Sequence, residues 1–249
     1  MKLVVYMKEV PDTEANIRIG ADKKSIVEEN VTFIMNPYDE YAVEEALKIK
    51  EAKGGETTAV CIGKERADEV LRSALAMGMD HPIRIQGDST VLDGLSHSKM
   101  LAKVLKDVKF DILLMGKETI DDGSKQIGPM LGELLNLPCI TLVTRLEVGE
   151  GKLTAERAVE GGTEVVEASF PCIITAQKGL NEPRYPSLRG KMMAKKAAIE
   201  VREAASEESR VKLVSIQYPP ARGESKVVGE SVEAVPELIR LLREESKVI

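Results

Sequence analysis

Short apolar segments alternate with segments of helical periodicity through the first half of the chain, and this alternation limits the possible folds more than any other feature. The apolar segments have the length of buried strands, whereas the intervening segments repeat apolar residues at helical spacing. Strands separated by helices form parallel sheets with helices on both faces. The sequence therefore predicts an α/β fold, a Rossmann-like parallel sheet covered by helices. The expected strands are residues 2–7, 57–62, 82–85 and 110–115, and helices are expected to begin near Pro37, Arg66, Leu92 and Gln126.

The chain changes character after Pro138, where β-rich segments follow one another without intervening helices. Glycines separate three of these segments, which is typical of an antiparallel meander. From Ala176 the chain becomes irregular, and apolar periodicity thins beyond Lys196. We therefore expect residues 1–196 to form the domain and residues 197–249 to form an extended C-terminal arm. The expected elements are strands at 140–148, 152–159, 163–169, 172–175 and 211–216, and a final helix at 233–242.

Composition and charge argue against several classes of function. The 249-residue chain has a net charge of −6, whereas nucleic-acid binding requires a basic surface, so we expect no nucleic-acid partner. No apolar run can span a bilayer and the N-terminus does not resemble a secretory signal, so we expect no membrane insertion. The three cysteines lie in apolar runs, as in a reducing compartment, and a cytoplasmic location follows. With two histidines and none of the common metal or catalytic motifs, the sequence predicts neither a metal site nor a catalytic residue.

A polar loop between the strand at 110–115 and the next helix is the candidate binding site. This loop contains Gly123 and Ser124 close to the helix entrance. The first backbone N–H groups of a helix have no partner within it, so such a loop can bind an anion. An ordinary capped turn is the alternative interpretation. Because ligands bind at the carboxyl ends of parallel strands, Tyr6 and Ile62 should lie at the same rim as Gly116.

Two further features suggest a docking surface. A basic cluster near residue 190 suits an acidic partner, although a solvated face is the simpler interpretation. Leu180 stands among polar neighbours, and we expect it to be the exposed apolar anchor of an interface. A plain turn is the alternative for the residues that follow it. The cluster consists of Arg189, Lys191, Lys195 and Lys196.

Several motifs, in one order along the chain, resemble those of the electron transfer flavoprotein β subunit family. The most specific is the run LNEPRYPSL at 180–188, followed by Lys191 and by AKK at 194–196. The others are NPYD at 36–39, ALAMG at 74–78, the loop that starts at Gly116, and EGG at 160–162. The resemblance covers nearly the whole chain, and it implies a sheet of the adenine-nucleotide-binding type.

The resemblance implies a heterodimer in which an α subunit carries the redox-active FAD. In this family the pair accepts electrons from flavin-containing dehydrogenases, often acyl-CoA dehydrogenases, and passes them on. The β subunit binds AMP in most members and a second FAD in electron-bifurcating members. By position, the implied nucleotide-binding residues are Tyr6, Asn36, Pro37, Tyr38, Asp39, Ile62, Gly116, Lys117, Asp121, Asp122, Gly123, Ser124, Lys125, Gln126 and Ile127.

The resemblance also implies surfaces for partner proteins. The dehydrogenase-recognition loop would span residues 176–190 with Leu180 as its anchor, and the arm at 197–249 would pack on the α subunit. The implied partner-binding residues are Leu180, Asn181, Glu182, Pro183, Arg184 and Tyr185.

Departures from the family pattern leave the nucleotide open. Many AMP-binding members have three consecutive acids in the loop, whereas here Gly123 follows Asp121 and Asp122. Pro129 and the run at 10–13 resemble bifurcating relatives, while the motifs at 36–39 and 181–185 resemble the AMP type. We expect an electron carrier subunit that binds AMP and is not itself an enzyme. The alternatives are a β subunit of a bifurcating, NADH-oxidising complex with a second FAD, and a stand-alone adenine-nucleotide sensor.

Overall fold

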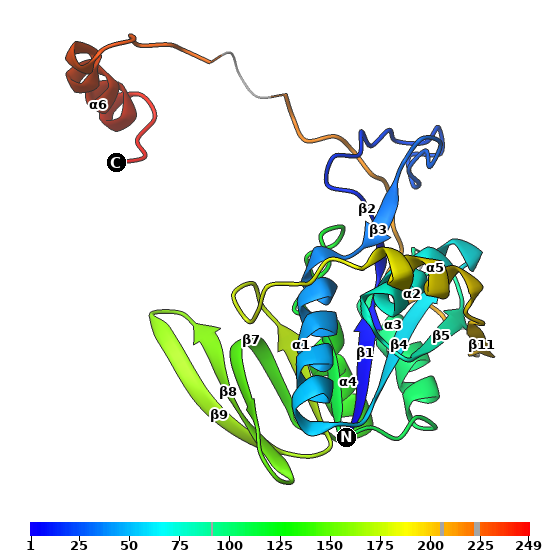
Figure 1. The fold of residues 1–249 in the computed structure, drawn as a ribbon. Helices are drawn as coiled ribbons and strands as arrows, with labels where there is room; N and C mark the ends of the chain where they lie inside the picture. The colour runs from blue at the N-terminus through cyan, green and yellow to red at the C-terminus, as the bar shows by residue number, and fades with distance from the viewer. Residues whose placement is uncertain (91, 205–206, 222–224) are drawn as a thin grey trace.

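The computed structural model describes residues 1–90, 92–204, 207–221 and 225–249, and its centre is a nine-stranded sheet (Figure 1). The strands of this sheet are β1 (Lys2–Met7), β4 (Glu56–Gly63), β5 (His81–Gln86), β6 (Ile112–Gly116), β7 (Cys139–Val148), β8 (Lys152–Val159), β9 (Gly162–Ser169), β10 (Cys172–Ala176) and β11 (Glu200–Glu203). Their spatial order is β11-β5-β4-β1-β6-β10-β7-β8-β9. All pairs from β11 to β7 are parallel, and β8 and β9 extend the sheet as an antiparallel hairpin. A short antiparallel ribbon of β2 (Glu9–Pro11) and β3 (Phe33–Met35) lies outside it.

Helices cover both faces of the parallel part of the sheet. The helices that cover it are α1 (Pro37–Lys53), α2 (Asp68–Met77), α3 (Gly94–Leu105) and α4 (Ile127–Leu135). The other helical elements of the described ranges are η1 (Glu65–Ala67), α5 (Leu188–Lys196), η2 (Val232–Ala234) and α6 (Val235–Glu244). One buried cluster joins α1 and α2 to one face of the sheet, and a second cluster joins α3 and α4 to the other face. Along β1, Leu3 and Val5 belong to the first cluster and Val4 and Tyr6 to the second. A strand buried on both faces must be apolar at successive positions, and β1 is.

The predicted α/β architecture is confirmed, including the parallel order and the antiparallel meander after Pro138. The strands at 2–7 and 152–159 have the predicted bounds, and the other predicted strands of the first 176 residues differ from the observed ones by one or two residues at their ends. The expected helices on both faces are present, with α3 beginning two residues after Leu92. Such end shifts are common where a cap, here Asp93, decides the first turn.

Two elements after Ala176 were not predicted, and one predicted strand is absent. Residues 188–196 form α5, whose Gly190 packs so closely on α2 that a Cβ would lie 2.3 Å from the carbonyl oxygen of Ala76. β11 joins the sheet beside β5 through backbone pairing, although its side chains are mostly exposed. The predicted strand at 211–216 is wrong, because this apolar segment has no β-partner in the described part of the chain.

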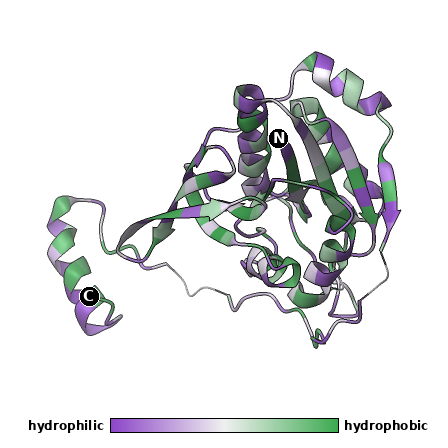
Figure 2. Ribbon diagram, turned by 90° about the horizontal axis from the view of Figure 1, so that it is seen from below, coloured by the Kyte–Doolittle hydropathy of each residue, from purple (hydrophilic) through white to green (hydrophobic). Residues whose placement is uncertain are grey.

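The segment after β11 follows the surface of the domain before it reaches α6. Asp93, at the start of α3, accepts hydrogen bonds from the backbone N–H groups of Arg210 at 2.6 Å and Val211 at 3.1 Å. The N–H group of Ile216 then donates to the carbonyl oxygen of Lys23 at 2.7 Å. α6 lies apart from the sheet in Figure 1, and Figure 2 shows apolar and polar residues alternating along it. Within the described ranges, no helix is long and apolar enough to cross a membrane.

Candidate functional site

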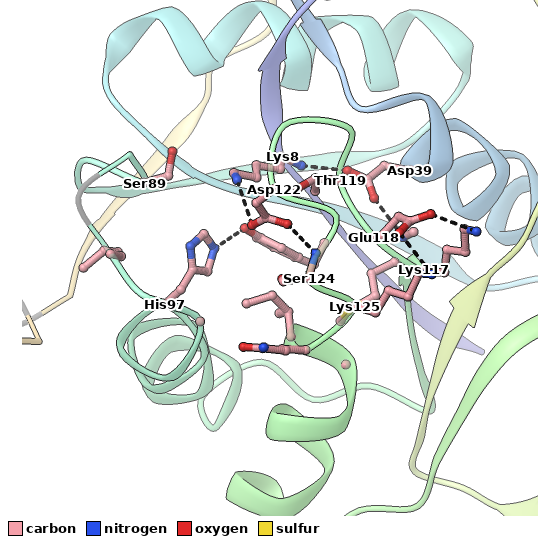
Figure 3. Close-up of a pocket in the computed structure, with 18 residues that line it drawn as sticks. Lys8, Asp39, Ser89, His97, Lys117, Glu118, Thr119, Asp122, Ser124 and Lys125 are labelled. Atoms are coloured by element: carbon pink, nitrogen blue, oxygen red, sulfur yellow. Dashed lines mark hydrogen bonds and ion pairs between the residues drawn. The ribbon is translucent and has the colours of Figure 1, made fainter. Parts of the chain in front are cut away.

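A pocket lies at the carboxyl ends of β1 and β6, where the sequence places the nucleotide site (Figure 3). Its walls come from the end of β1, the loop after β6, the segment before α3, and the first turns of α3 and α4. The lining residues are Tyr6, Lys8, Asp39, Ser89, Leu92, Gly94, His97, Met115, Gly116, Lys117, Glu118, Thr119, Asp122, Ser124, Lys125, Gln126, Ile127 and Gly128. Three strand-to-helix connections therefore meet at one rim of the sheet, as ligand sites of such sheets do.

Asp39 in the first turn of α1 connects the two central strands at this rim. Its carboxylate accepts the backbone N–H groups of Lys8 and Gly116, each at 2.8 Å. The side chain is buried, and burial raises the pKa of Asp39 to about 7, although the two N–H groups lower it. A Cβ on Gly116 would lie 2.5 Å from the Asp39 carboxylate and 2.7 Å from Cβ of Tyr38, so glycine is required there by close packing.

Asn36 precedes α1 and holds the loop that follows β6. It occupies the predicted N-cap position, but its side chain makes no capping hydrogen bond to the helix. Instead the amide nitrogen donates to the carbonyl oxygen of Glu118 at 2.9 Å, and the amide oxygen accepts from the N–H group of Ile120 at 3.2 Å. The NPYD motif thus anchors the loop through Asn36 and both strand ends through Asp39.

The loop itself is a folded turn in which charged groups pair with one another. Lys8 contacts Asp121 at 2.7 Å and Asp122 at 3.6 Å. Glu118 pairs with Lys117 at 2.8 Å and with Lys125 at 3.4 Å. Each pocket lysine is therefore paired with at least one of the chain's own carboxylates, and Lys117 and Lys125 share that of Glu118. Donors without such a charge partner include the first backbone N–H groups of α4, whose preceding residue makes no side-chain cap.

Backbone conformation shapes the end of this loop. Gly123 has φ +61° and Lys125 has φ +57°, both in the left-handed region. The N–H group of Gly123 donates to the carbonyl oxygen of Thr119, and the N–H group of Ser124 donates to the carboxylate of Asp122 at 2.9 Å. At the start of α4, a Cβ on Gly128 would lie 2.5 Å from Thr175 in β10. The helix N-terminus is therefore packed directly on the sheet.

Tyr6 and His97 form a buried pair at the opposite wall of the pocket. The Tyr6 hydroxyl is hydrogen-bonded to Nε2 of His97, and the rings meet edge to face with centroids 5.6 Å apart. Burial lowers the pKa of His97 to about 4 and raises the pKa of Tyr6 well above its ordinary value. Both side chains are therefore uncharged at pH 7.

The structure brings most of the predicted nucleotide-site residues together. Nine of them line the pocket, namely Tyr6, Asp39, Gly116, Lys117, Asp122, Ser124, Lys125, Gln126 and Ile127. Asn36, Asp121 and Gly123 shape the loop behind it, and Pro37 and Tyr38 begin α1 beside Gly116. Ile62 is not among the lining residues; it is fully buried in the core beneath the rim.

Sequence reasoning missed the contribution of the third strand-to-helix connection. Ser89, Leu92, Gly94 and His97 reach the pocket from the segment after β5 and from α3. The missed signal was positional, because β5 lies beside β4 and its carboxyl end must face the same rim. Glu118 and Thr119 line the pocket from within the loop that was expected to form the site, and Lys8 and Met115 line it from the strand ends expected at the rim. Gly128, one residue beyond that loop, was also missed.

The expectation that Leu180 is exposed is wrong. Leu180 is only 9% exposed and belongs to the core cluster beneath α1. Polar contacts on both sides hold its segment on that helix: Asn181 donates to the carbonyl oxygen of Tyr41 and to Glu45, both at 2.9 Å. Arg184 pairs with Glu44 at 2.8 Å and also with Glu51. A leucine among polar residues was read as exposed, but its polar neighbours bind the helix that covers it.

The exposed apolar residues of this region lie further along the chain. Tyr185 is 97% exposed, Leu188 is 78% exposed and Met192 is 62% exposed. Lys191, Lys195 and the other basic residues of α5 are exposed around them. Together these residues form an apolar patch with a basic surround, which we call the α5 patch. A group of exposed apolar side chains marks a contact surface more often than a single exposed apolar side chain does.

No group of three or more His, Cys, Asp or Glu side chains is arranged to hold a metal ion within the described ranges. The pocket instead offers hydrogen-bond donors, small residues and a helix N-terminus, which suits an organic anion.

Comparisons with known proteins agree with this arrangement. Residues 24–207 match the model of the electron transfer flavoprotein domain. The chain is 46% identical to the electron transfer flavoprotein subunit beta of Bacillus subtilis, with both chains covered completely. It is 40% identical to the subunit of the same name from Syntrophomonas wolfei, covering 96% of this chain and 92% of that one, and 36% identical to the one from Mus musculus, covering 100% and 99%. These matches span the pocket, the segment after β10 and the arm, and the chain therefore belongs to the electron transfer flavoprotein β subunit family.

Proposed function

We propose that this chain is the β subunit of a heterodimeric electron transfer flavoprotein and that it binds AMP in the pocket at the ends of β1 and β6. The complex would take electrons from flavin-containing dehydrogenases, such as acyl-CoA dehydrogenases, and deliver them to a downstream acceptor. In this proposal the redox chemistry is supplied by FAD held mainly by the α subunit. The chain itself acts as an electron carrier subunit with no catalytic residue.

The observation that supports nucleotide binding most directly is the convergence of Asn36, Asp39 and the loop after Gly116 at the N-terminus of α4. Backbone N–H groups at the start of α4 would hold the phosphate, together with Ser124 and Gln126. The lysines around them are paired with carboxylates, so a phosphate would be bound chiefly by neutral donors. Glycine at positions 116 and 128 fits such a site, since a side chain at either position would clash with the elements that form the walls of the pocket.

The nucleotide content of the purified complex tests this proposal. Denaturation of the heterodimer should release one FAD and one AMP, which can be counted by chromatography. Release of two FAD and no AMP would instead support the electron-bifurcating alternative, in which the complex oxidises NADH. Expression of this chain alone addresses the sensor alternative: a stable, nucleotide-binding monomer that needs no partner would favour a sensor over a subunit.

We also propose that the arm, residues 197–249, packs on the α subunit. Several of its large apolar side chains are exposed in the isolated chain, including Leu238 and Ile239 on α6, which lies apart from the sheet in Figure 1. Exposed residues of this kind on an extended segment are stabilised by burial against a partner. They are Val211, Val214, Tyr218, Val227, Val232, Leu238 and Ile239.

For dehydrogenase recognition, we propose the segment 176–190 together with the α5 patch. Leu180, Asn181 and Arg184 would set the conformation of this segment through their contacts with α1, with Glu182 and Pro183 between them. Tyr185 and Leu188 would then make the apolar contact, because they are the exposed apolar residues of the segment. The basic residues of α5 would favour an acidic surface on the dehydrogenase.

A further inference from the structure

His97 places a hydrogen-bonding atom in the pocket that the chain itself does not use. The residue is only 4% exposed, yet its side chain lines the pocket. Nε2 is hydrogen-bonded to Tyr6, whereas Nδ1 has no hydrogen-bond partner within residues 1–90, 92–204, 207–221 and 225–249 (Figure 3). Nδ1 is also not fully buried. The one side-chain nitrogen or oxygen in those ranges that is both fully buried and without a hydrogen-bond partner is Oδ1 of Asn181. A buried polar side chain that lines a pocket and has an unpartnered nitrogen is suited to a ligand.

The contact with Tyr6 determines which hydrogen bond that nitrogen can make. Both side chains are uncharged at pH 7, so the shared hydrogen bond has two arrangements. If Nε2 donated to Tyr6, the tyrosine proton would need another acceptor, and the described residues supply none. If the Tyr6 hydroxyl donates to Nε2, both groups are satisfied and the imidazole proton resides on Nδ1. The second arrangement leaves Nδ1–H, on a side chain that lines the pocket, as a donor without a partner in the described ranges.

The charge pattern of the pocket indicates what this donor would bind. Lys8, Lys117 and Lys125 are each within 3.4 Å of a carboxylate of the chain. An anion in the pocket therefore depends on donors that carry no charge partner. The N-terminus of α4 supplies such donors on one side, and Nδ1–H of His97 supplies one from α3.

We propose that His97 is a ligand-binding residue whose Nδ1–H donates a hydrogen bond to a phosphate oxygen of the bound nucleotide, with Tyr6 as the positioning residue that fixes the tautomer. This inference rests on the proposed nucleotide-binding function. It adds a contact from α3 to a site otherwise built from β1, α1 and the loop before α4.

Two substitutions separate the roles of the ring nitrogens. A glutamine can accept from Tyr6 near the position of Nε2 but offers no donor near Nδ1, whereas an asparagine amide reaches the position of Nδ1. The purified heterodimer, freed of the nucleotide in this pocket, would be titrated with AMP and with adenosine by calorimetry. His97→Gln should weaken AMP binding about 10- to 100-fold, the range for a hydrogen bond to a charged group, and should leave adenosine binding unchanged. His97→Asn should lose less AMP affinity than His97→Gln.

His81→Gln is the matched control, because the other histidine lies exposed on β5 and does not line the pocket. Thermal melts of each variant would establish that it is folded. Unchanged AMP affinity in both folded His97 variants would overturn the inference while leaving AMP binding intact. An equal loss for AMP and adenosine would overturn the assignment to phosphate. If the wild-type heterodimer binds neither AMP nor a second FAD in this pocket, the proposed function fails, and this inference fails with it.

The role of Tyr6 has a spectroscopic readout. The chain has two histidines, so nitrogen-correlated NMR of the full-length protein resolves both rings, and His81→Gln assigns them. His97 should carry its proton on Nδ1 in the wild type, and Tyr6→Phe should shift it toward Nε2 because the hydroxyl donor is gone. A proton on Nε2 in the wild-type chain would contradict the proposed geometry.

Discussion

The carboxylate of Asp39 lies 2.8 Å from the backbone nitrogen of Gly116, and this contact joins the first turn of α1 to the end of β6. The same carboxylate accepts the N–H group of Lys8 at the end of β1. One buried side chain therefore fixes the relative position of two strand ends that border the pocket. A carboxylate with both oxygens bonded to backbone in this way positions its neighbours rather than binding a ligand directly.

Replacement of Gly116 by alanine should disrupt this junction. The added Cβ would lie within 3 Å of both Asp39 and Tyr38, so the backbone must shift. We expect Gly116→Ala to lower the free energy of unfolding by about 1–3 kcal/mol, measured by urea denaturation. Gly162→Ala is the control, because a Cβ there meets no atom within 4 Å, and its effect should stay below about 0.5 kcal/mol. Equal stability of both variants would contradict the packing argument.

Gly123→Val should reduce nucleotide retention through the backbone. Space is available there, since the nearest atom to an added Cβ is Oε2 of Glu118 at 4.0 Å, but φ is +61°. A β-branched residue in the left-handed region costs about 1–2 kcal/mol, which would open the turn. We expect less AMP or FAD to be released from the purified variant complex. Gly123→Asn should retain more nucleotide than the valine variant, because asparagine tolerates this conformation.

His97 should make stability depend on pH on the acid side. Its pKa is about 4 in the folded chain, because burial disfavours the charged ring, and about 6.5 when exposed. The unfolded chain therefore binds the proton more readily, and the contribution is fully present above pH 6.5 and is lost as the pH falls toward 4. The loss from this group is up to about 3 kcal/mol.

The difference in the free energy of unfolding between wild type and His97→Gln isolates the contribution of His97. Asp39 acts in the opposite direction, since its raised pKa makes stability fall as the pH rises from about 4 toward 7, but it is present in both proteins. Denaturation curves at several pH values should show the free energies of unfolding of the two proteins approaching each other as the pH falls from 6.5 to 4. A constant difference across that window would show that His97 titrates normally.

Leu180 and Leu188 should respond differently to truncation. Leu180→Ala removes a core side chain and should lower the free energy of unfolding by about 2–3 kcal/mol. Leu188→Ala removes an exposed side chain, so its stability should change by less than about 0.5 kcal/mol. Under the proposed function, Leu188→Ala should slow electron transfer from the dehydrogenase in stopped-flow measurements while the flavin spectrum is unchanged. A normal rate in that variant would place the contact elsewhere.

Asp93 should control how the arm is held on the domain. One carboxylate oxygen accepts the N–H group of Ser96 at 2.7 Å and caps α3, while the other accepts from Arg210 and Val211. These contacts hold the pKa of Asp93 well below its usual range. Asp93→Ala should destabilise the chain by about 1 kcal/mol and expose residues 207–218 to protease. Asp107→Ala, which removes an exposed carboxylate just beyond the other end of α3, is the control and should leave the cleavage rate unchanged.

Most of the architecture was predictable because local periodicity reflects local burial. A strand buried on both faces is continuously apolar, as residues 3–7 are, and a helix on a sheet repeats its apolar residues every three to four positions. The rim of the sheet followed from the parallel order alone, which is why Tyr6, Gly116 and the loop before α4 were expected together. α5 and β11 were not predicted, because their exposed faces carry little apolar periodicity. Contacts with α2 and β5 stabilise them instead.

The sequence by itself therefore determined the order of the sheet strands through residue 176, the edge of the sheet that carries the site, and the family. The tertiary structure decided which side chains meet there. Tyr6 and His97 are 91 positions apart, and nothing in either local pattern indicates that they pair. Leu180 and Leu188 lie in one motif, yet one packs under α1 and the other faces outward. Local periodicity records whether a position is buried, whereas the identity of its neighbours depends on how distant segments pack.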